Sequence, residues 1–446
     1  MKVCLLNDSF PPQIDGVANV VKNYAHHLTE FGSSVCVATP HYPDVADDYP
    51  FDVVRYRSFD TTRFIGYRAG YPFAPDALEK LAGFGADIYH SHCPISSNIL
   101  ARTLRESAPA PLVFTYHTKF DIDIANAVKG QLLQQAAINV LVKNIDACDE
   151  IWAVSEGAGK NLESLGYEGP WRIMRNGVDF PKGAPPEAEC RAIRERHGIG
   201  PDEPMLLFVG RLMWYKGLRT VLDALQALKE ADVPFKMVFV GDSLERAEIE
   251  IYAETLRLAD RCIFTGAVRD REELRRYFGA ADLFMFLSDF DTNGIVVREA
   301  AACGCAAMLL RDSAAAEGIL HGQNGFLTER GTASVSALLT KLCLQPQLMR
   351  AVGQNAMEEL YYSWQDAVYC AHQRYGEILD DYRSGRLQLK RRPMDTVFDA
   401  AADIHDALER AHNQRERHKA EFGSLLLQPL PPDISPALPQ SFELGL

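Results

Sequence analysis

Hydrophobic positions in this chain fall into short, uninterrupted apolar runs that are separated by longer amphipathic segments. The first series of runs covers residues 3–6, 35–39, 53–56, 88–90, 112–116 and 151–154. Runs without polar alternation are typical of strands that are buried on both faces. Between them the apolar residues take helical spacing, as in residues 17–31, which end at Gly32. The pattern predicts a parallel sheet with helices on both faces.

A second series of apolar runs covers residues 205–209, 236–240, 262–265, 283–287 and 307–310. The two series are separated by the turn signal Asn176-Gly177 and by residues 181–204, which are rich in proline and charge. The sequence therefore predicts an α/β protein with two doubly wound, Rossmann-like domains facing a cleft, residues 1–180 and 181–360. Residues 122–148 are predicted as one long helix, residues 361–384 as a C-terminal helix, and residues 385–446 as a tail of unknown role.

Composition narrows the class of protein. The chain has 446 residues, 47% of them hydrophobic and 24% charged, which is typical of a globular protein with a sizeable core. A net charge of −14 argues against nucleic acid as a partner. The ten cysteines include no CxxC pair, and we expect them to be reduced in the cytoplasm. We also find no signal peptide or transmembrane run, so we expect a cytoplasmic protein that contacts the inner face of a membrane at most peripherally.

The segment from Asp282 to Gly304 carries the strongest chemical signal. An apolar strand leads into a polar loop, and a helix follows from Gly294, so that Asp291 and Glu299 flank the start of that helix. Ligands of open α/β sheets bind at the carboxyl ends of the strands, where this loop begins. Amides at a helix N-terminus favour anions. The arrangement suits a nucleotide sugar, but the segment alone equally fits a strand-loop-helix unit with solvated acids.

Charged and titratable residues also follow other predicted strands. Arg211 and Lys216 come after the run 205–209, where two fixed cations could neutralise a leaving diphosphate. An isolated pair of this kind is more often a pair of surface cations, but this one belongs to the same sheet as Gly294. His117 follows the run 112–116 and should therefore face the cleft, although a lone histidine is commonly structural. We interpret His90 and His92, at another strand end, as lining the cleft.

Three motifs together resemble glycosyltransferase family 4. They are Gly210-Arg211…Lys216-Gly217, the acid pair Asp291 and Glu299, and Asn176-Gly177-Val178-Asp179, and the resemblance spans residues 2–382. It implies the GT-B fold, a helix within residues 361–384 that crosses back to the N-terminal domain, and transfer of a hexose from a nucleotide-diphosphate sugar with retention of configuration. It also implies an enzyme of the hexosyltransferase class.

The resemblance assigns roles to individual positions. It implies catalytic roles for His117, beside the transferred sugar, and for Arg211 and Lys216 at the diphosphate. The donor-binding set that it implies is Gly16, Arg211, Lys216, Asp291, Gly294, Ile295 and Glu299. Members of the family generally need no metal, so the resemblance implies no metal and no cofactor, with a donor such as UDP-glucose.

The sequence departs from the family pattern at three places. Asp291 stands where glutamate is usual, which leaves the identity of the donor sugar open. The first loop has Asp15-Gly16 instead of two glycines, which could restrict the approach of the backbone to phosphate. Gly304-Cys305-Ala306 replaces a Gly-x-Pro, a change that we interpret as structural.

The acceptor is the least determined part of the function. Residues 55–73 interleave arginines with aromatics, which suits lipid headgroups but equally suits internal packing. Tyr-His-Thr at residues 116–118 resembles the diacylglycerol glucosyltransferase branch, which implies a lipid acceptor. The alternatives are a mannosyl- or other hexosyltransferase acting on a glycan or small molecule, a GT-B epimerase or phosphorylase, and a non-catalytic nucleotide-sugar binder.

Overall fold

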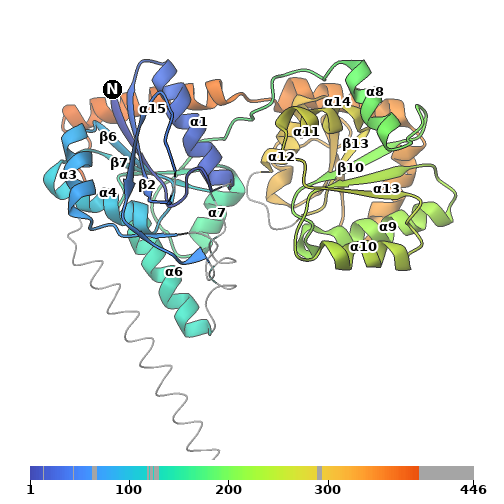
Figure 1. The fold of residues 1–446 in the computed structure, drawn as a ribbon, viewed down its shortest axis with the longest axis horizontal. Helices are drawn as coiled ribbons and strands as arrows, with labels where there is room; N and C mark the ends of the chain where they lie inside the picture. Colours follow the sequence, from blue (N-terminus) through green and yellow to red (C-terminus); the bar gives the residue numbers. More distant parts are fainter. Residues whose placement is uncertain are drawn as a thin grey trace, which may run out of the picture.

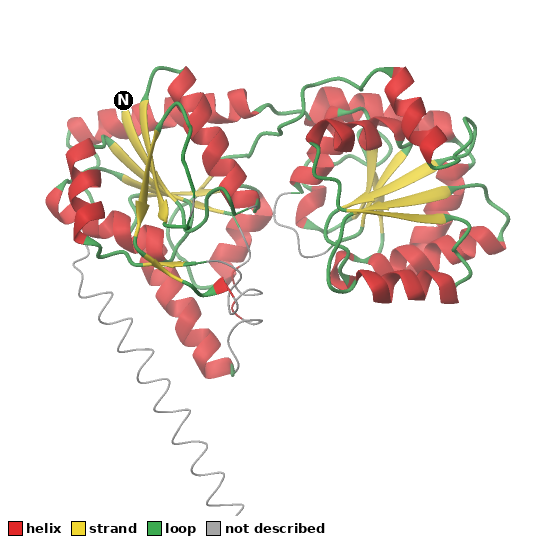
Figure 2. Ribbon diagram, in the orientation of Figure 1, coloured by secondary structure: helices red, strands yellow, loops and turns green. Residues whose placement is uncertain are grey.

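The protein folds into two lobes joined by two adjacent stretches of chain (Figure 1). The structure is a computed structural model that describes residues 1–13, 15–43, 45–62, 68–117, 120, 124, 130–288 and 294–390. Each lobe is built on one parallel sheet with helices on both faces (Figure 2). No described helix combines the length and the apolar stretch that a membrane span requires.

The N-terminal lobe is built on a seven-stranded sheet in the order β3-β2-β1-β6-β7-β8-β9, with every adjacent pair parallel. The strands are β1 Lys2–Leu6, β2 Ser34–Pro40, β3 Asp52–Tyr56, β6 Ile88–Ser91, β7 Leu112–Tyr116, β8 Glu150–Ala153 and β9 Arg172–Ile173. The helices are α1 Gly16–Glu30, α3 Pro75–Phe84, α4 Ser96–Ser107, α6 Gln131–Asp146 and α7 Glu156–Ser164. A two-stranded antiparallel sheet, β4 Ser58–Phe59 with β5 Ala69–Gly70, lies beside this core.

The C-terminal lobe repeats the design with a six-stranded parallel sheet in the order β12-β11-β10-β13-β14-β15. Its strands are β10 Met205–Val209, β11 Lys236–Val240, β12 Cys262–Gly266, β13 Leu283–Phe286, β14 Ala306–Leu310 and β15 Phe326–Thr328. Its helices are α8 Glu187–Arg196, α9 Leu218–Glu230, α10 Arg246–Thr255, α11 Arg271–Ala280, α12 Ile295–Ala302, α13 Thr332–Cys343 and α14 Pro346–Leu360, with short 3-10 turns at η1 Trp214–Lys216 and η2 Ala314–Ala316.

The apolar runs predict the strands because both faces of each sheet are buried. In β10, Leu206 and Phe208 pack into one apolar cluster, while Met205, Leu207 and Val209 pack into the cluster on the opposite face. A strand of this kind needs apolar side chains at every position. The predicted fold class, two doubly wound α/β domains of GT-B type, is confirmed by this topology.

The last described helix, α15 Trp364–Arg383, returns to the N-terminal lobe and packs along α1. On the way it passes beside the first crossing, where Val178 forms a parallel bridge with Ser363. The backbones approach so closely that a Cβ on Gly177 would lie 2.4 Å from Cα of Trp364. Glycine at this position therefore allows the two crossings to lie side by side.

Three expectations need correction. The helix predicted over residues 122–148 is not continuous, because Gly130 has φ +105° and α6 begins only at Gln131. The short strands β4, β5, β9 and β15 were not predicted, since two or three residues give too little pattern to separate a strand from a loop. His90 and His92 do not line the cleft but are buried in the N-terminal lobe.

Candidate functional site

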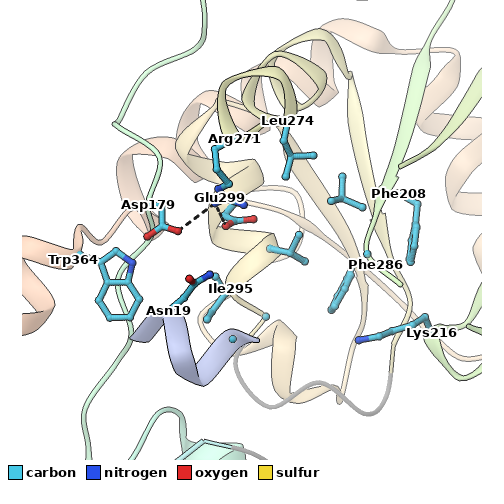
Figure 3. Close-up of a pocket in the computed structure, with 15 residues that line it drawn as sticks. Asn19, Asp179, Phe208, Lys216, Arg271, Leu274, Phe286, Ile295, Glu299 and Trp364 are labelled. Atoms are coloured by element: carbon cyan, nitrogen blue, oxygen red, sulfur yellow. Dashed lines mark hydrogen bonds and ion pairs between the residues drawn. The ribbon is translucent and has the colours of Figure 1, made fainter. Parts of the chain in front are cut away.

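A cavity of about 380 Å³ lies between the lobes, at the carboxyl edge of the C-terminal sheet (Figure 3). Both lobes contribute to its wall. The N-terminal lobe supplies the start of α1, and the crossings supply Asp179 and Trp364. The lining residues are Gly16, Asn19, Asp179, Phe208, Val209, Gly210, Lys216, Arg271, Leu274, Phe286, Gly294, Ile295, Val296, Glu299 and Trp364. Five residues of the predicted donor-binding set are thus brought together here: Gly16, Lys216, Gly294, Ile295 and Glu299.

Glu299 is the buried acid of the cavity. It lies on α12, and only 7% of its surface is exposed. Burial raises the pKa of its carboxyl group, while the nearby guanidinium of Arg271 lowers it. Arg271 donates from Nη2 to Oε1 of Glu299 at 2.5 Å. The carboxyl group therefore lies at the cavity wall with a cationic partner already in place.

Arg271 connects Glu299 to the other lobe. Its Nη2 atom also lies 3.5 Å from Oδ2 of Asp179, and Asp179 in turn accepts a hydrogen bond from Asn23 of α1 at 3.0 Å. The guanidinium carbon lies 4.4 Å from the centre of the Phe180 ring, which favours a cation there. Figure 3 shows Arg271 between the two carboxylates. A line of charged and polar side chains thus runs from α1 to α12 across the interface of the lobes.

Three residues of the cavity wall, Arg271, Asn19 and Trp364, had no predicted role. Arg271 had a signal, because it opens a helix just after strand β12, at the same sheet edge as Gly294. Asn19 and Trp364 had none, since they belong to α1 and α15, and only the packing of the two lobes brings them to the cavity.

The start of α12 offers a second binding feature. Gly294 is the N-cap and has φ +55°, and a Cβ at this position would lie 2.9 Å from Cβ of Ala315. Glycine thus provides both the left-handed backbone and the space that the turn requires. The amides of the first turn, at Ile295 and Val296, have no partner within the helix and suit an anion. Asp291, predicted to hold the donor sugar, lies outside the described residues.

The predicted cations follow β10. Lys216 ends η1, and its side chain extends toward the cavity with Nζ 5.7 Å from the centre of the Phe286 ring (Figure 3). Its place is fixed by Gly217, where a Cβ would lie 2.3 Å from the carbonyl oxygen of Leu287. Arg211 is exposed and donates from Nη2 to the Tyr215 hydroxyl at 2.9 Å, and it is not among the residues that line the cavity.

The first loop of the N-terminal lobe meets the cavity at Gly16. A Cβ on Gly16 would find no described atom within 4 Å, so this part of the wall is open. The preceding residue, Asp15, is the N-cap of α1, and its carboxylate accepts a hydrogen bond from the amide of Ala18 at 2.8 Å. Asp15, which stands where the family pattern has a glycine, therefore caps helix α1.

We expect Asp15→Ala to lower the free energy of unfolding by about 1 kcal/mol, because the substitution removes the acceptor for a first-turn amide. Asp15→Asn is the matched variant, since its side-chain oxygen can still accept that hydrogen bond. Denaturant unfolding of both variants measures the difference. Equal stability of Asp15→Ala and the unsubstituted protein would show that the cap contributes nothing.

His117 lies at the end of β7, and 6% of its surface is exposed. It is not among the residues that line the cavity. Burial lowers the pKa of its imidazole to about 3, so the ring is neutral at neutral pH. Its Nε2 atom lies 2.9 Å from Nδ1 of His92. A neutral imidazole can donate one hydrogen bond and accept another without adding charge.

Comparison with known proteins agrees with this architecture. Residues 14–181 match the model described as Glycosyltransferase Family 4, and residues 190–359 match the model described as Glycosyl transferases group 1. The chain is 27% identical over 309 residues to the alpha-monoglucosyldiacylglycerol synthase of Streptococcus pneumoniae, covering 68% of this chain and 70% of that one.

Solved structures share the two-lobed fold. Sucrose-phosphate synthase of Thermosynechococcus elongatus aligns with a TM-score of 0.69 and 20% identity, covering 85% of this chain and 99% of that one. HepE of Anabaena in complex with UDP-glucose aligns with a TM-score of 0.64 and 19% identity, covering 85% of this chain and all of that one (100%). The two family models meet at the crossing between the lobes, and together they span both walls of the cavity. The chain is therefore a glycosyltransferase and belongs to glycosyltransferase family 4, with the GT-B fold.

Proposed function

We propose that this protein transfers a hexose, glucose in our assignment, from UDP-glucose to a lipid acceptor with retention of configuration. The observation that carries the proposal is the cavity in which Glu299, the start of α12 and Lys216 share one wall. A nucleoside diphosphate has a ribose diol and two phosphates, and these groups match a carboxylate, first-turn amides and a cation. HepE was solved with UDP-glucose, which supports this choice of donor.

In this proposal Glu299 accepts hydrogen bonds from the ribose hydroxyls. Arg271 already occupies one of its oxygens, so the ribose would share that carboxylate with Arg271 or displace it. The amides of Ile295 and Val296 then bind a phosphate, with Lys216 from the adjoining turn as the cation. Gly16 of the opposite lobe leaves room for the diphosphate and the sugar.

Catalysis follows from stabilising the leaving diphosphate. As the bond between the sugar and the phosphate breaks, negative charge grows on the phosphate oxygens, and a fixed cation and helix amides stabilise that charge most in the transition state. Arg211, in the turn between β10 and η1, would add a second positive charge to this effect. His117, neutral because it is buried, would bind a hydroxyl of the transferred sugar.

We expect the activity to be independent of divalent metal. Lys216, Arg211 and the α12 amides would supply the charge stabilisation that a metal provides in other transferases. Transfer rates should be the same with EDTA and with added Mg²⁺ or Mn²⁺, and a metal-dependent transferase assayed in parallel confirms that the chelation works. Activity lost in EDTA and restored by a divalent ion would contradict the expectation.

A lipid acceptor is supported by the relative from Streptococcus pneumoniae, an alpha-monoglucosyldiacylglycerol synthase. Membrane contact through residues 55–73 is part of the proposal, but Arg55 and Arg68 are not its basis. Arg55 pairs with Asp47 at 2.7 Å, and Arg68 donates to the hydroxyl of Ser58 at 2.9 Å. Phe59 and Tyr71, 53% and 37% exposed, are the aromatic pair available to a lipid surface, and residues 63–67 lie outside the described ones.

A panel of nucleotide sugars tests the proposal, with release of the nucleoside diphosphate as the readout. We expect release from UDP-glucose in the presence of anionic vesicles that contain diacylglycerol, a glucosylated lipid as product, and flotation of the protein with those vesicles. Turnover of a different nucleotide sugar would replace UDP-glucose as the assigned donor. Products from donor alone would indicate an epimerase, a pyridoxal absorbance a phosphorylase, and nucleotide binding without turnover a non-catalytic protein.

A further inference from the structure

Three histidines form a buried stack in the N-terminal lobe. His90 lies on β6, His92 directly follows that strand, and His117 directly follows β7. The ring centres of His90 and His92 are 4.0 Å apart, and those of His92 and His117 are 5.2 Å apart with planes inclined by 21°. The stack therefore leads from the interior of the sheet to its carboxyl edge.

The hydrogen bonds of the stack divide it into two parts. One nitrogen of His90 lies 2.5 Å from the Tyr375 hydroxyl and the other lies 2.7 Å from the Thr115 hydroxyl, so both have partners away from His117. His92 is the ring that reaches His117, through the 2.9 Å contact between its Nδ1 and Nε2 of His117. His92 therefore acts directly on His117, and His90 does not.

Two neutral imidazoles that share a hydrogen bond fix each other's tautomers. Burial lowers the pKa of His92 well below its usual range and that of His117 to about 3, so each ring carries one proton at neutral pH. In the shared contact one nitrogen must donate and the other must accept. The positions of the proton on His92 and of the proton on His117 are thus coupled through this contact.

The second nitrogen of His92 indicates which of the two rings donates the hydrogen bond between His92 and His117. Its Nε2 is buried and has no hydrogen-bond partner among the residues that the structure describes. If Nδ1 of His92 accepted from His117, the proton of His92 would lie on Nε2 as a buried N–H, with only the Tyr24 ring, centred 5.4 Å from the His92 ring, as a weak acceptor. Buried donors without partners are rarer in proteins than under-satisfied acceptors. If Nδ1 of His92 donates instead, Nε2 of His92 carries no proton and is only an acceptor without a partner.

We propose that His92 is a positioning residue that donates its Nδ1 proton to Nε2 of His117, which fixes the ring and keeps the proton of His117 on Nδ1. The functional part of this inference rests on the proposed role of His117 beside the transferred sugar. With this tautomer, a substrate oxygen that meets Nδ1 of His117 receives a hydrogen bond. His117 then acts as a neutral donor and not as a base.

Nitrogen NMR of the full-length protein tests the tautomer directly. Long-range ¹H–¹⁵N correlation spectra of ¹⁵N-histidine-labelled protein distinguish a protonated from a bare ring nitrogen, and His117→Gln assigns the signals of His117. We expect a protonated Nδ1 and a bare Nε2 on His117. The reverse pattern on His117, with the Nε2–H of His92 directed at the Tyr24 ring, overturns the proposal. A positively charged His117 ring, with both nitrogens protonated, also overturns it. The result does not depend on transfer activity, so it stands apart from any failure of the proposed function.

Kinetics of three variants test the consequence. His92→Phe keeps a flat ring but removes the hydrogen bond, and we expect kcat to fall about 10- to 100-fold. We expect the KM for the donor to change less than about twofold, since donor binding does not use this contact. His92→Asn can donate from an amide near the Nδ1 position and should keep most of the activity. His90→Asn controls for disruption of the buried stack, and thermal melting shows whether each variant folds. Equal kcat for the Phe and Asn variants of His92, both folded, would overturn the proposal.

Discussion

Lys216→Met is expected to lower the kcat of sugar transfer by about 100- to 1,000-fold, the largest effect of any single substitution outside the core. Lys216 lines the cavity from η1, and its ammonium group lies beside the faces of the Tyr215 and Phe286 rings. Around these rings water screens charge poorly, so a cation stabilises a developing phosphate charge strongly. That charge is greatest in the transition state. The KM for the donor should therefore change less than kcat.

Two variants make this prediction specific. Lys341→Met removes an exposed lysine from α13, outside the cavity lining, and should leave kcat unchanged. Lys216→Arg keeps the charge but changes its geometry, and should retain part of the activity because arginine binds phosphate as a planar fork. Steady-state rates with the donor identified by the panel measure all three. An unchanged kcat for Lys216→Met would show that Lys216 does not contribute to catalysis.

Glu299→Gln is expected to weaken binding of the nucleoside diphosphate by about 10- to 100-fold with a smaller effect on kcat. A carboxylate accepts hydrogen bonds from both ribose hydroxyls, whereas an amide has a single acceptor oxygen. The change also replaces the charged partner of Arg271, whose Nη2 lies 2.5 Å from Oε1 of Glu299, by a neutral amide. Calorimetry with UDP measures the affinity directly and does not require a known acceptor. Glu272→Gln, on the exposed first turn of α11, is the control.

The pH dependence of the same binding reports the charge on Glu299. Burial raises the pKa of this carboxyl group, although Arg271 opposes the shift. Because the ionised form is the better acceptor, affinity for UDP should fall as the pH decreases through the raised pKa, at a higher pH than an ordinary glutamate would give. Arg271→Gln removes the opposing cation and should move this fall to still higher pH, whereas Glu299→Gln should abolish it. Affinity independent of pH in the unsubstituted protein would show that Glu299 does not contact the ribose as an acceptor.

Two of the three departures from the family pattern have a structural explanation, and the third, Asp291, does not. Asp15 has a local explanation as the cap of α1, and it leaves Gly16 open toward the cavity. The segment Gly304-Cys305-Ala306 has the backbone of Gly304 at φ +75° and Cys305 buried, consistent with a role in packing. Asp291 lies outside the described residues, so its effect on the choice of sugar stays a prediction that the donor panel can test.

The sequence by itself determined the strands and the sheet edge that carries the chemistry. Parallel strands covered on both faces must be apolar at every position, so runs such as 205–209 mark them without a partner in view. Residues that directly follow such strands lie at one edge, and for this reason Lys216, Gly294 and Glu299 could be placed together from the sequence. Turn residues such as Gly177 marked the crossing between the lobes, although not the backbone contact that requires glycine.

Only the tertiary structure decided how the two lobes complete the site. Asn19, Asp179 and Trp364 reach the cavity because α1, the first crossing and α15 pack against one another, and no local pattern encodes contacts between such distant segments. The same holds for Arg271, which bridges Glu299 and Asp179. The contact between His92 and His117 was also decided by the tertiary structure, because hydrogen bonds between side chains of neighbouring strands depend on the register of β6 against β7. Strand ends determine which residues can act together, and packing between the lobes decides which of them do.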